Sequence, residues 1–297
     1  MNIRGSTRLV AVLGWPVEHS GSPAMHNAAF VASGLDFAYV PCAVHPDDLA
    51  PAVAGLRALR FAGANVIIPH KQAICRHLDE LDESARIVGA VNTIRRVESR
   101  LVGYNTDGPG LIRSLGDADC EVEGRRAAII GAGGAGRAVA WAVARAGAAD
   151  VAIINRTPSK AEDVARLVNA AVGRDVARPY PLADPVNREV IGRADLIVDT
   201  TDVGMYPNVD VPPVVPADWL LPKHVVCDIT YNPRETVLLR AARERGARTV
   251  DGLGMLVHQG AVGFELWTGE AAPIAFMRGA LEAALAAAER RANRSEV

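Results

Sequence analysis

The chain has 297 residues, of which 32 are basic and 34 acidic, so its formal net charge at pH 7 is −2. Hydrophobic residues make up 49% and charged residues 22%, the balance of a globular protein long enough for two domains. This charge balance excludes an electrostatic case for binding nucleic acid or a membrane surface. The N-terminal apolar run is too short for a signal peptide, and we expect a cytoplasmic protein without membrane spans.

Short β-rich runs alternate with alanine-rich helical runs, a pattern typical of an α/β protein with parallel sheets. In the first third of the chain we expect strands at 8–14, 37–44 and 64–69 and helices at 22–34 and 71–78. Ser22 is expected at the N-cap of the first helix, and Lys71 in the first turn of the second.

A β-hairpin is expected over 90–105, where two β runs surround a turn near Glu98. With the turn centred there, the numbers of facing residues sum to about 198, so Asn92 lies opposite or nearly opposite Thr106. Asn92 and Asp107 then share one end of the hairpin. The run YNTDGPG around Asp107 is rich in turn residues, so Asp107 is expected to shape a bend.

The middle of the chain has the pattern of a strand, a glycine-rich turn, a helix and a second strand, followed by two more strands of the same sheet. The expected elements are a strand at 127–130, a helix at 137–146, a strand ending at Asn155, and strands within 193–201 and 223–231. Helices over 251–269 and 273–292 close the chain. Gly108–Gly110 and Gly252–Gly254 lie on either side of this middle unit and are interpreted as hinges.

Gly131, Gly133 and Gly136 form the pattern G-x-G-x-x-G. The pattern alone is weak, but its place after a strand and before a helix is what dinucleotide binding requires. Glycines permit a tight turn and a close approach of the backbone to a pyrophosphate, and the helix N-terminus offers free N–H groups. A tight turn without a ligand is the alternative.

The end of the second strand distinguishes the two nicotinamide cofactors. NAD sites place Asp or Glu there to bind the ribose 2′-hydroxyl. This chain has Asn155, Arg156 and Thr157 instead, with Lys160 one turn later. Two cations suit a 2′-phosphate, which an arginine can bind through two hydrogen bonds, so the sequence favours NADP. The alternative is a solvent-facing arginine and lysine.

Further polar residues follow expected strands, where ligands of open α/β sheets bind. They are Ser20, Ser22, Lys71, Thr200, Thr201, Asp228 and Thr230. A structural alternative exists for several: Ser22 as a helix cap, Lys71 as a solvated side chain, Asp107 as a plain turn residue. The four scattered cysteines indicate reduced thiols, and no set of His, Cys and carboxylates has metal spacing, so no metal is expected.

Nine motifs occur in the order typical of the shikimate dehydrogenase family, which the chain resembles over nearly its whole length. The motifs are GWPVEHSGSP, GANVIIPHK, GAVNTI, GYNTDGPG, GAGGAGRA, NRT, TTDVGMYP, CDITYNP and DGLGMLVHQGA. The resemblance implies reversible, NADPH-dependent reduction of 3-dehydroshikimate to shikimate in aromatic amino-acid biosynthesis. It also implies an N-terminal α/β substrate domain, residues 1–107 and 252–297, and a Rossmann-type NADP-binding domain, residues 108–251. The C-terminal helices would return to the first domain.

The resemblance assigns roles to individual residues. Lys71 and Asp107 would be the catalytic pair that holds the reacting hydroxyl, and which of the two carries the proton stays open. For the substrate it implies Ser20, Ser22 and Tyr231 at the carboxylate, Asn92 and Gln259 at ring hydroxyls, and Ile67 at a further contact position. For NADP it implies Gly131, Ala132, Gly133, Gly134, Ala135, Gly136, Arg137, Asn155, Arg156, Thr157, Lys160, Thr201, Gly252 and Met255.

Ile67 departs from the family pattern, which usually has a threonine that hydrogen-bonds the substrate. Losing that donor costs about 0.5–1.5 kcal/mol, so quinate, aminoshikimate or another cyclic polyol acid is the alternative substrate. Asp199 and Asp202 are a second departure, at positions where Asn and an uncharged residue are commoner. A non-catalytic ligand-binding regulator is the alternative from another class, and the presence of both Lys71 and Asp107 counts against it. The sequence does not define the oligomeric state and leaves a homodimer open.

Overall fold

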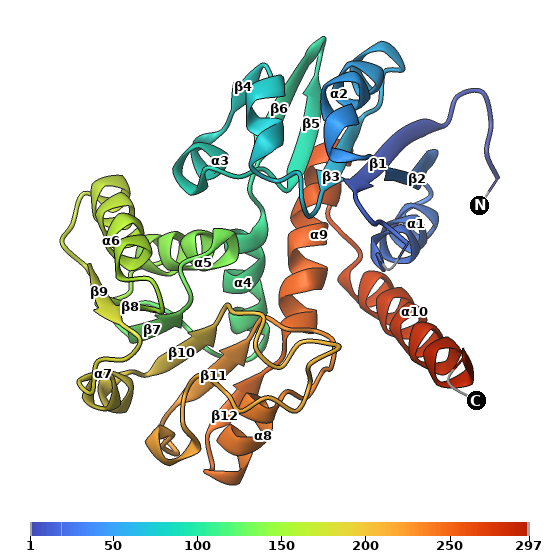
Figure 1. The fold of residues 1–297 in the computed structure, drawn as a ribbon. Helices are drawn as coiled ribbons and strands as arrows, with labels where there is room; N and C mark the ends of the chain where they lie inside the picture. Colours follow the sequence, from blue (N-terminus) through green and yellow to red (C-terminus); the bar gives the residue numbers. More distant parts are fainter. Residues whose placement is uncertain (1, 19, 296–297) are drawn as a thin grey trace. The chain divides into compact units, whose positions relative to one another are not determined.

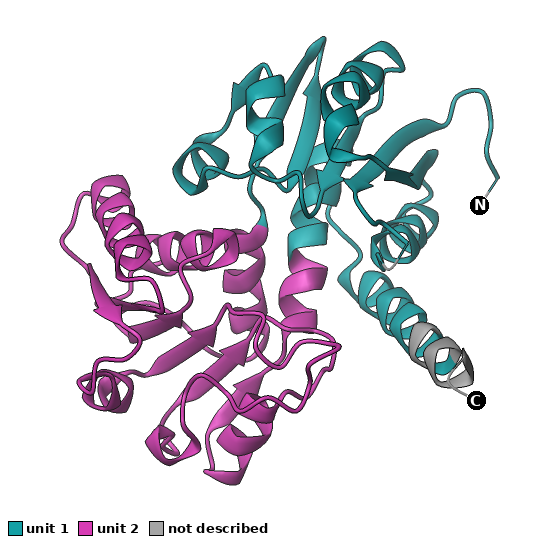
Figure 2. Ribbon diagram, viewed as in Figure 1, with its two compact units in different colours: residues 1–106, 259–297 teal, residues 107–258 magenta. Residues whose placement is uncertain are grey.

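The computed structural model describes residues 2–18 and 20–295 and divides into two compact units. Unit 1 comprises residues 1–106 and 259–297, and unit 2 comprises residues 107–258 (Figure 2). The boundaries expected from the sequence lie after residues 107 and 251. Helix α9 (Gly252–Thr268) contains the second boundary between the compact units, so its first turns belong to unit 2 and its last turns to unit 1.

Unit 1 contains, within the described residues, a six-stranded mixed sheet with helices (Figure 1). Its strands are β1 (Arg8–Gly14), β2 (Phe37–Ala43), β3 (Gly63–Val66), β4 (Glu80–Leu81), β5 (Thr93–Val97) and β6 (Arg100–Tyr104). Its helices are α1 (Ser22–Ala32), α2 (Leu49–Ala58), α3 (Glu83–Val88), the end of α9, α10 (Ile274–Ser295), and the 3-10 helices Pro46–Asp48 and Ala73–His77. The strand order is β2-β1-β3-β5-β6-β4.

The sheet of unit 1 is mixed because a hairpin is inserted into it. β1 pairs in parallel with β2 and β3, whereas β5 is antiparallel to both β3 and β6. In the hairpin Thr93 pairs with Tyr104 and Val97 with Arg100, which confirms the turn at Glu98 and Ser99. The numbers of facing residues sum to 197, one less than the predicted value. The sheet thus combines the expected parallel pairs with the predicted antiparallel hairpin.

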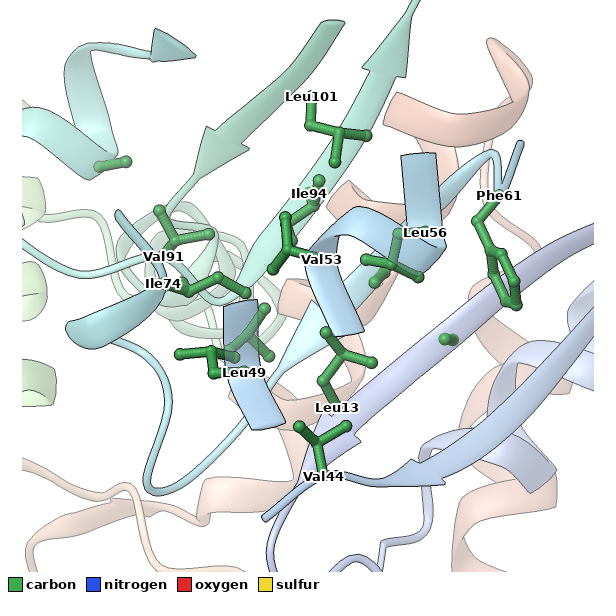
Figure 3. Packing of buried hydrophobic residues seen from close by; sticks show 14 residues of the cluster. Leu13, Val44, Leu49, Val53, Leu56, Phe61, Ile74, Val91, Ile94 and Leu101 are labelled. Atoms are coloured by element: carbon green, nitrogen blue, oxygen red, sulfur yellow. The ribbon is translucent and has the colours of Figure 1, made fainter. Parts of the chain in front are cut away.

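One hydrophobic core of unit 1 lies between its sheet and α2. Leu49, Val53 and Leu56 follow the spacing of a helix face, and all three are buried against side chains of the sheet that include Leu13 and Ile94 (Figure 3). On α1, Met25 and Phe30 are buried as well, and the Phe30 ring stacks on Phe264 of α9 with centroids 5.4 Å apart. Burial of both faces explains why β1 has an apolar run without alternation.

Unit 2 contains a six-stranded sheet of parallel strands in the order β12-β11-β10-β7-β8-β9, described over all its residues. The strands are β7 (Arg126–Ile130), β8 (Asp150–Asn155), β9 (Ala177–Pro181), β10 (Leu196–Asp199), β11 (Val225–Asp228) and β12 (Arg248–Val250). The helices are α4 (Asp107–Asp117), α5 (Gly134–Arg145), α6 (Pro158–Val172), α7 (Asn187–Arg193), α8 (Val237–Glu244), the start of α9, and the 3-10 helix Ala217–Trp219.

This strand order is that of a doubly wound dinucleotide-binding sheet. From β7 the chain runs outward through β8 to β9, then returns to the other side of β7 with β10, β11 and β12. The direction reverses between β7 and β10, and ligands of such sheets bind beyond the carboxyl ends of the strands at that point. The prediction of further parallel strands in one sheet is confirmed.

Two local predictions in unit 1 are wrong. Helix α1 begins at Ser22 with Gly21 at the N-cap, because the Gly21 carbonyl accepts the first helical hydrogen bond, from Met25 N at 3.2 Å. Lys71 precedes the 3-10 helix Ala73–His77 and does not lie in its first turn. Its carbonyl accepts instead from the backbone N–H of Val91 at 2.7 Å, a partner outside the local turn.

The predicted bend and hinges are helical. Asp107 is the first residue of α4, so it does not shape a bend, and Gly108 and Pro109 lie in the first turn. A side chain at Gly108 would place its Cβ 2.8 Å from Ala142 Cβ and 2.9 Å from the Ala138 carbonyl oxygen, so this glycine permits α4 to pack on α5. Gly252 likewise begins a helix, α9.

No helix in the described part of the chain is long and apolar enough to cross a membrane.

Candidate active site

Thr106 joins two predicted substrate ligands in unit 1. Asn92 is 3% exposed, and its Oδ1 accepts from the backbone N–H of Thr106 at 2.8 Å and from the Thr106 hydroxyl at 3.2 Å. The same hydroxyl lies 3.4 Å from Oε1 of Gln259 on α9. The structure therefore brings Asn92 and Gln259 together around Thr106, as expected of groups that bind neighbouring hydroxyls of one ring.

Of the two predicted catalytic residues, Lys71 lies in a loop held by a backbone hydrogen bond, and Asp107 begins a helix. The carbonyl of Lys71 accepts from Val91 N, directly before Asn92, and Lys71 is half-buried. Asp107 follows Thr106 in the chain and is 8% exposed at the start of α4, where the helix dipole favours a carboxylate.

Ser20 and Ser22 lie at the start of α1 and are half-buried. The backbone N–H of Ser22 donates to Ser20 Oγ at 3.3 Å, so the Ser20 hydroxyl takes over part of the capping expected of Ser22. Hydroxyls beside the N–H groups of a helix start suit a small carboxylate.

Ile67 presents hydrocarbon directly after β3. Its backbone N–H donates to the Leu13 carbonyl at 3.0 Å, and its side chain covers Gly14, since a Cβ on Gly14 would meet Ile67 Cγ1 at 2.3 Å. The half-buried Ile67 can supply van der Waals contact at this position but no hydrogen bond.

The glycine loop of unit 2 has the geometry that the sequence pattern predicts. Gly131 has a φ of +101°, which favours glycine. A Cβ on Gly136 would lie 2.3 Å from the Gly131 carbonyl oxygen, whereas a Cβ on Gly133 or Gly134 would meet nothing within 4 Å. The loop therefore leaves open space above the N-terminus of α5, and its residues fit a pyrophosphate.

The turn after β8 is tied to this loop. Asn155 Oδ1 accepts from the backbone N–H of Ala132 at 3.1 Å, and its Nδ2 donates to the Thr157 carbonyl at 2.9 Å. Arg156 and Lys160 are exposed beside it. No carboxylate stands at the end of β8, so the residues fit a ribose 2′-phosphate better than a free 2′-hydroxyl.

Thr200 and Thr201 complete the switch point between β7 and β10. Thr200 Oγ1 donates to the carbonyl of Ile130 at 2.7 Å, and a Cβ on Gly131 would lie 2.7 Å from this Oγ1. The backbone N–H of Thr201 donates to Asp199 Oδ1 at 2.8 Å. This segment therefore packs directly beside the glycine loop.

The remaining predicted residues of unit 2 cluster after β11. Tyr231 is half-buried, and Met255 on α9 is 7% exposed. The Gly252 N–H lies 3.2 Å from the Thr230 carbonyl oxygen, and a Cβ on Gly252 would meet the Ile229 carbonyl oxygen at 2.2 Å. Gly252 thus brings the start of α9 against the segment that contains Tyr231.

Two buried carboxyl groups lie on adjacent strands near this site. Asp199 and Asp228 are register partners at the ends of β10 and β11, and they are 2% and 1% exposed. Burial, together with the Asp228 and Asp202 carboxylates, raises the pKa of Asp199 to about 6. Burial also raises the pKa of Asp228, against hydrogen bonds from Thr236 and Thr230.

Replacing Asp199 by asparagine should stabilise the protein at pH 8. A carboxyl group whose pKa is raised on folding holds its proton more tightly in the folded state, so stability falls as pH rises from about 4 through 6. The amide keeps the Oδ1 acceptor for Thr201 and removes this penalty, a gain of about 3 kcal/mol at pH 8. Denaturant melts at pH 8 and pH 4 measure it, and an equal gain at both pH values would contradict the assignment.

Among the described residues, no three His, Cys, Asp or Glu side chains are grouped so that they could hold a metal ion.

The fold and these sites define a class: an oxidoreductase with a doubly wound dinucleotide-binding unit and a separate mixed α/β unit. Three family models match the chain: "Shikimate dehydrogenase substrate binding domain" over residues 12–94, "Shikimate / quinate 5-dehydrogenase" over 114–202, and "Shikimate 5'-dehydrogenase C-terminal domain" over 252–282. The NADP(+)-dependent shikimate dehydrogenase of Moorella thermoacetica is 49% identical over 287 residues, covering 97% of each chain. The chain belongs to the shikimate dehydrogenase family.

Solved structures agree with this assignment. The shikimate 5-dehydrogenase of Thermus thermophilus, crystallised with NADP(H) and shikimate, has a TM-score of 0.83 at 37% identity, over 94% of this chain and 100% of that one. The quinate dehydrogenase of Corynebacterium glutamicum, crystallised with NAD, has a TM-score of 0.86 at 31% identity, over 93% of this chain and 99% of that one. The fold is thus shared by enzymes with different substrates and cofactors.

Sequence reasoning missed the residues behind the site. Thr106 was used only to define the hairpin register, although its backbone and hydroxyl both bind Asn92. Asn65 and Tyr39 were not singled out. The signal for Asn65 was present, since a polar amide within the apolar run ANVII of a central strand requires buried hydrogen-bond partners.

Proposed function

We propose that the protein is an NADP-dependent shikimate dehydrogenase, which reversibly reduces 3-dehydroshikimate to shikimate. Near-full-length identity of 49% to an enzyme of that name supports it. The observation that carries the proposal is the cluster of Asn92, Thr106 and Gln259, because it gathers amide groups for ring hydroxyls directly before Asp107.

The reaction needs a hydride and a proton, which come from different groups. NADPH, when bound, supplies the hydride that reaches the carbonyl carbon of the substrate. The carbonyl oxygen must gain a proton in the same reaction, and the reverse reaction removes both. Unit 2 supplies the glycine loop, Asn155 and Arg156 for the cofactor, and unit 1 supplies polar side chains for the substrate.

Lys71 and Asp107 are the proposed catalytic residues. A lysine ammonium donates hydrogen bonds to the reacting oxygen, and an aspartate carboxylate accepts one from a hydroxyl. Together they hold the reacting hydroxyl, and at least one of them relays its proton. Ser20, Ser22 and Tyr231 hold the substrate carboxylate, and Asn92 and Gln259 orient the ring through its other hydroxyls.

Arg156 should discriminate between the two cofactors. Replacing Arg156 by alanine removes a charged hydrogen-bond donor from the 2′-phosphate of NADP, which NAD lacks, so the KM for NADP should rise about tenfold or more. The KM for NAD should change little. Steady-state kinetics with both cofactors measure the two KM values. Equal changes in them would show that Arg156 does not bind the 2′-phosphate. Arg166→Ala, at an exposed arginine of α6, is the control.

Quinate is the second candidate substrate, and Ile67 is the observation that favours it. A hydrocarbon side chain at this position makes no hydrogen bond to a ring hydroxyl, and the quinate dehydrogenase of Corynebacterium glutamicum has the same fold. Oxidation of shikimate and of quinate, each with NADP and with NAD, separates the candidates. Turnover of shikimate with NADP alone supports the main proposal. Faster turnover of quinate assigns the chain to the second candidate.

Ile67→Thr tests whether this residue limits the enzyme. If shikimate is the substrate, restoring a hydroxyl should lower its KM by about threefold to tenfold, the net contribution of one hydrogen bond. An unchanged KM would show that Ile67 does not contact the substrate.

The four free cysteines support a reducing, cytoplasmic setting for the reaction.

A further inference from the structure

A buried tyrosine hydroxyl lies behind the substrate residues of unit 1. Tyr39 on β2 is 2% exposed, and its hydroxyl donates to Asn65 Oδ1 on β3 at 2.7 Å. The same hydroxyl is hydrogen-bonded to the side chain of Ser22 at the start of α1. Burial raises the pKa of Tyr39 well above its ordinary value, so the hydroxyl keeps its proton.

Asn65 carries the connection across the sheet. Its Nδ2 donates to the Asn92 carbonyl at 3.1 Å and to Thr93 Oγ1 at 3.0 Å. The Asn92 carbonyl can only accept, so the amide nitrogen of Asn65 must face it and the amide oxygen faces Tyr39. Asn65 is 5% exposed and forms hydrogen bonds with three different residues.

Thr93 and Thr106 complete the path to the substrate side. Thr93 is fully buried, and its hydroxyl lies 3.3 Å from the Thr106 hydroxyl. Thr106 in turn binds Asn92 Oδ1 through its backbone N–H at 2.8 Å. A single network of hydrogen bonds therefore runs from Ser22 to Asn92 without passing through solvent.

The ring of Tyr39 is held as firmly as its hydroxyl. His26 stacks on it with centroids 4.5 Å apart and an interplanar angle of 15°. His26 is fully buried, and burial lowers its pKa to about 3, so the stack is between neutral rings. The backbone of Tyr39 is also bound on both sides by the Asn27 amide, at 2.8 and 3.0 Å.

We propose that Tyr39, Asn65 and Thr93 are positioning residues of the substrate site. They form a relay that orders Ser22, a carboxylate ligand, at one end and Asn92, a ring-hydroxyl ligand, at the other. The inference rests on the proposed function, which gives Ser22 and Asn92 these roles. The relay presets the spacing between the two ends of the ring site before the substrate arrives, which lowers the ordering cost of binding.

Tyr39→Phe and Thr93→Val each remove one hydroxyl from the relay with almost no change in shape. Each should raise the KM for shikimate about threefold to tenfold, while kcat and the KM for NADP stay within about twofold. Because both variants interrupt one path, the double variant should lose less than the product of the two single losses. Thr93→Ser keeps the hydroxyl and should restore the wild-type KM.

Leu56→Ala is the control for lost core stability. Leu56 is 4% exposed in the core between α2 and the sheet, and it takes part in none of the relay hydrogen bonds. Removing its side chain should lower the melting temperature and leave the KM for shikimate unchanged. Equal KM changes in Leu56→Ala and Tyr39→Phe would overturn the relay, because loosened packing would explain both.

The outcomes separate the relay from the proposed function. Normal wild-type turnover of shikimate, with unchanged KM values in Tyr39→Phe and Thr93→Val, would overturn the relay alone. Absence of shikimate turnover by the wild-type enzyme would overturn both the relay and the proposed function. If Tyr39→Phe does not fold, the comparison of Thr93→Val with Thr93→Ser decides, since equal KM values in that pair would overturn the relay.

Discussion

Lys71→Ala is expected to lower kcat for shikimate oxidation by about 10²- to 10⁴-fold, the range for loss of a positioned acid or base. The substitution removes the ammonium group proposed to hold the reacting hydroxyl. The loop itself should survive, because it is fixed by backbone bonds, including Val91 N to the Lys71 carbonyl and His70 N to the Ile67 carbonyl. Stopped assays at saturating shikimate and NADP measure the loss.

Binding should largely survive in the same variant. The substrate contacts proposed for Ser20, Ser22, Asn92 and Gln259 are kept. The dissociation constant for shikimate, measured by calorimetry, should therefore rise far less than kcat falls. Lys223→Ala, at an exposed lysine before β11, is the control for loss of a positive charge. Unchanged kcat in Lys71→Ala would show that this residue has no catalytic role.

Gly136→Ala and Gly133→Ala should separate folding from cofactor binding. A methyl group at position 136 would lie 2.3 Å from the Gly131 carbonyl oxygen, so the backbone must move apart, at a cost of about 1–3 kcal/mol or more. Gly133→Ala meets nothing within 4 Å in the protein and should leave the melting temperature unchanged. Its methyl group should instead obstruct the approach of the pyrophosphate to the loop.

Two measurements on the same proteins test this. Gly136→Ala should lose both thermal stability and NADP binding, whereas Gly133→Ala should lose only NADP binding, by at least about tenfold in the dissociation constant. Gly116→Ala on α4, also without atoms within 4 Å, should change neither quantity. Normal NADP affinity in Gly133→Ala would place the pyrophosphate elsewhere.

Structural features that depend on residues close together in the chain could be predicted from the sequence. The run RLVAVLG is β1 from its first to its last residue, and the hairpin turn lies at Glu98 and Ser99 as predicted. The glycine pattern, with a strand before it and a helix after it, likewise predicted the nucleotide-binding turn. Each of these signals comes from residues close together in the chain, where local geometry decides the structure.

Structural features that depend on contacts between residues far apart in the chain could not be predicted in this way. The turn composition around Asp107 predicted a bend, but packing of Gly108 on Ala138 and Ala142 makes the segment helical. The relay from Tyr39 through Asn65 joins three strands far apart in sequence, so its residues look unrelated until the sheet is formed. Tertiary packing decided both cases.

The most direct test of the central claim is the rate at which the purified protein oxidises NADPH when 3-dehydroshikimate is added, with the product identified by chromatography. We expect saturable NADPH consumption that yields shikimate in equal amount, and much weaker consumption of NADH, because NADH lacks the 2′-phosphate that Arg156 is proposed to bind. No NADPH consumption, or a faster reaction with NADH, would contradict the assignment.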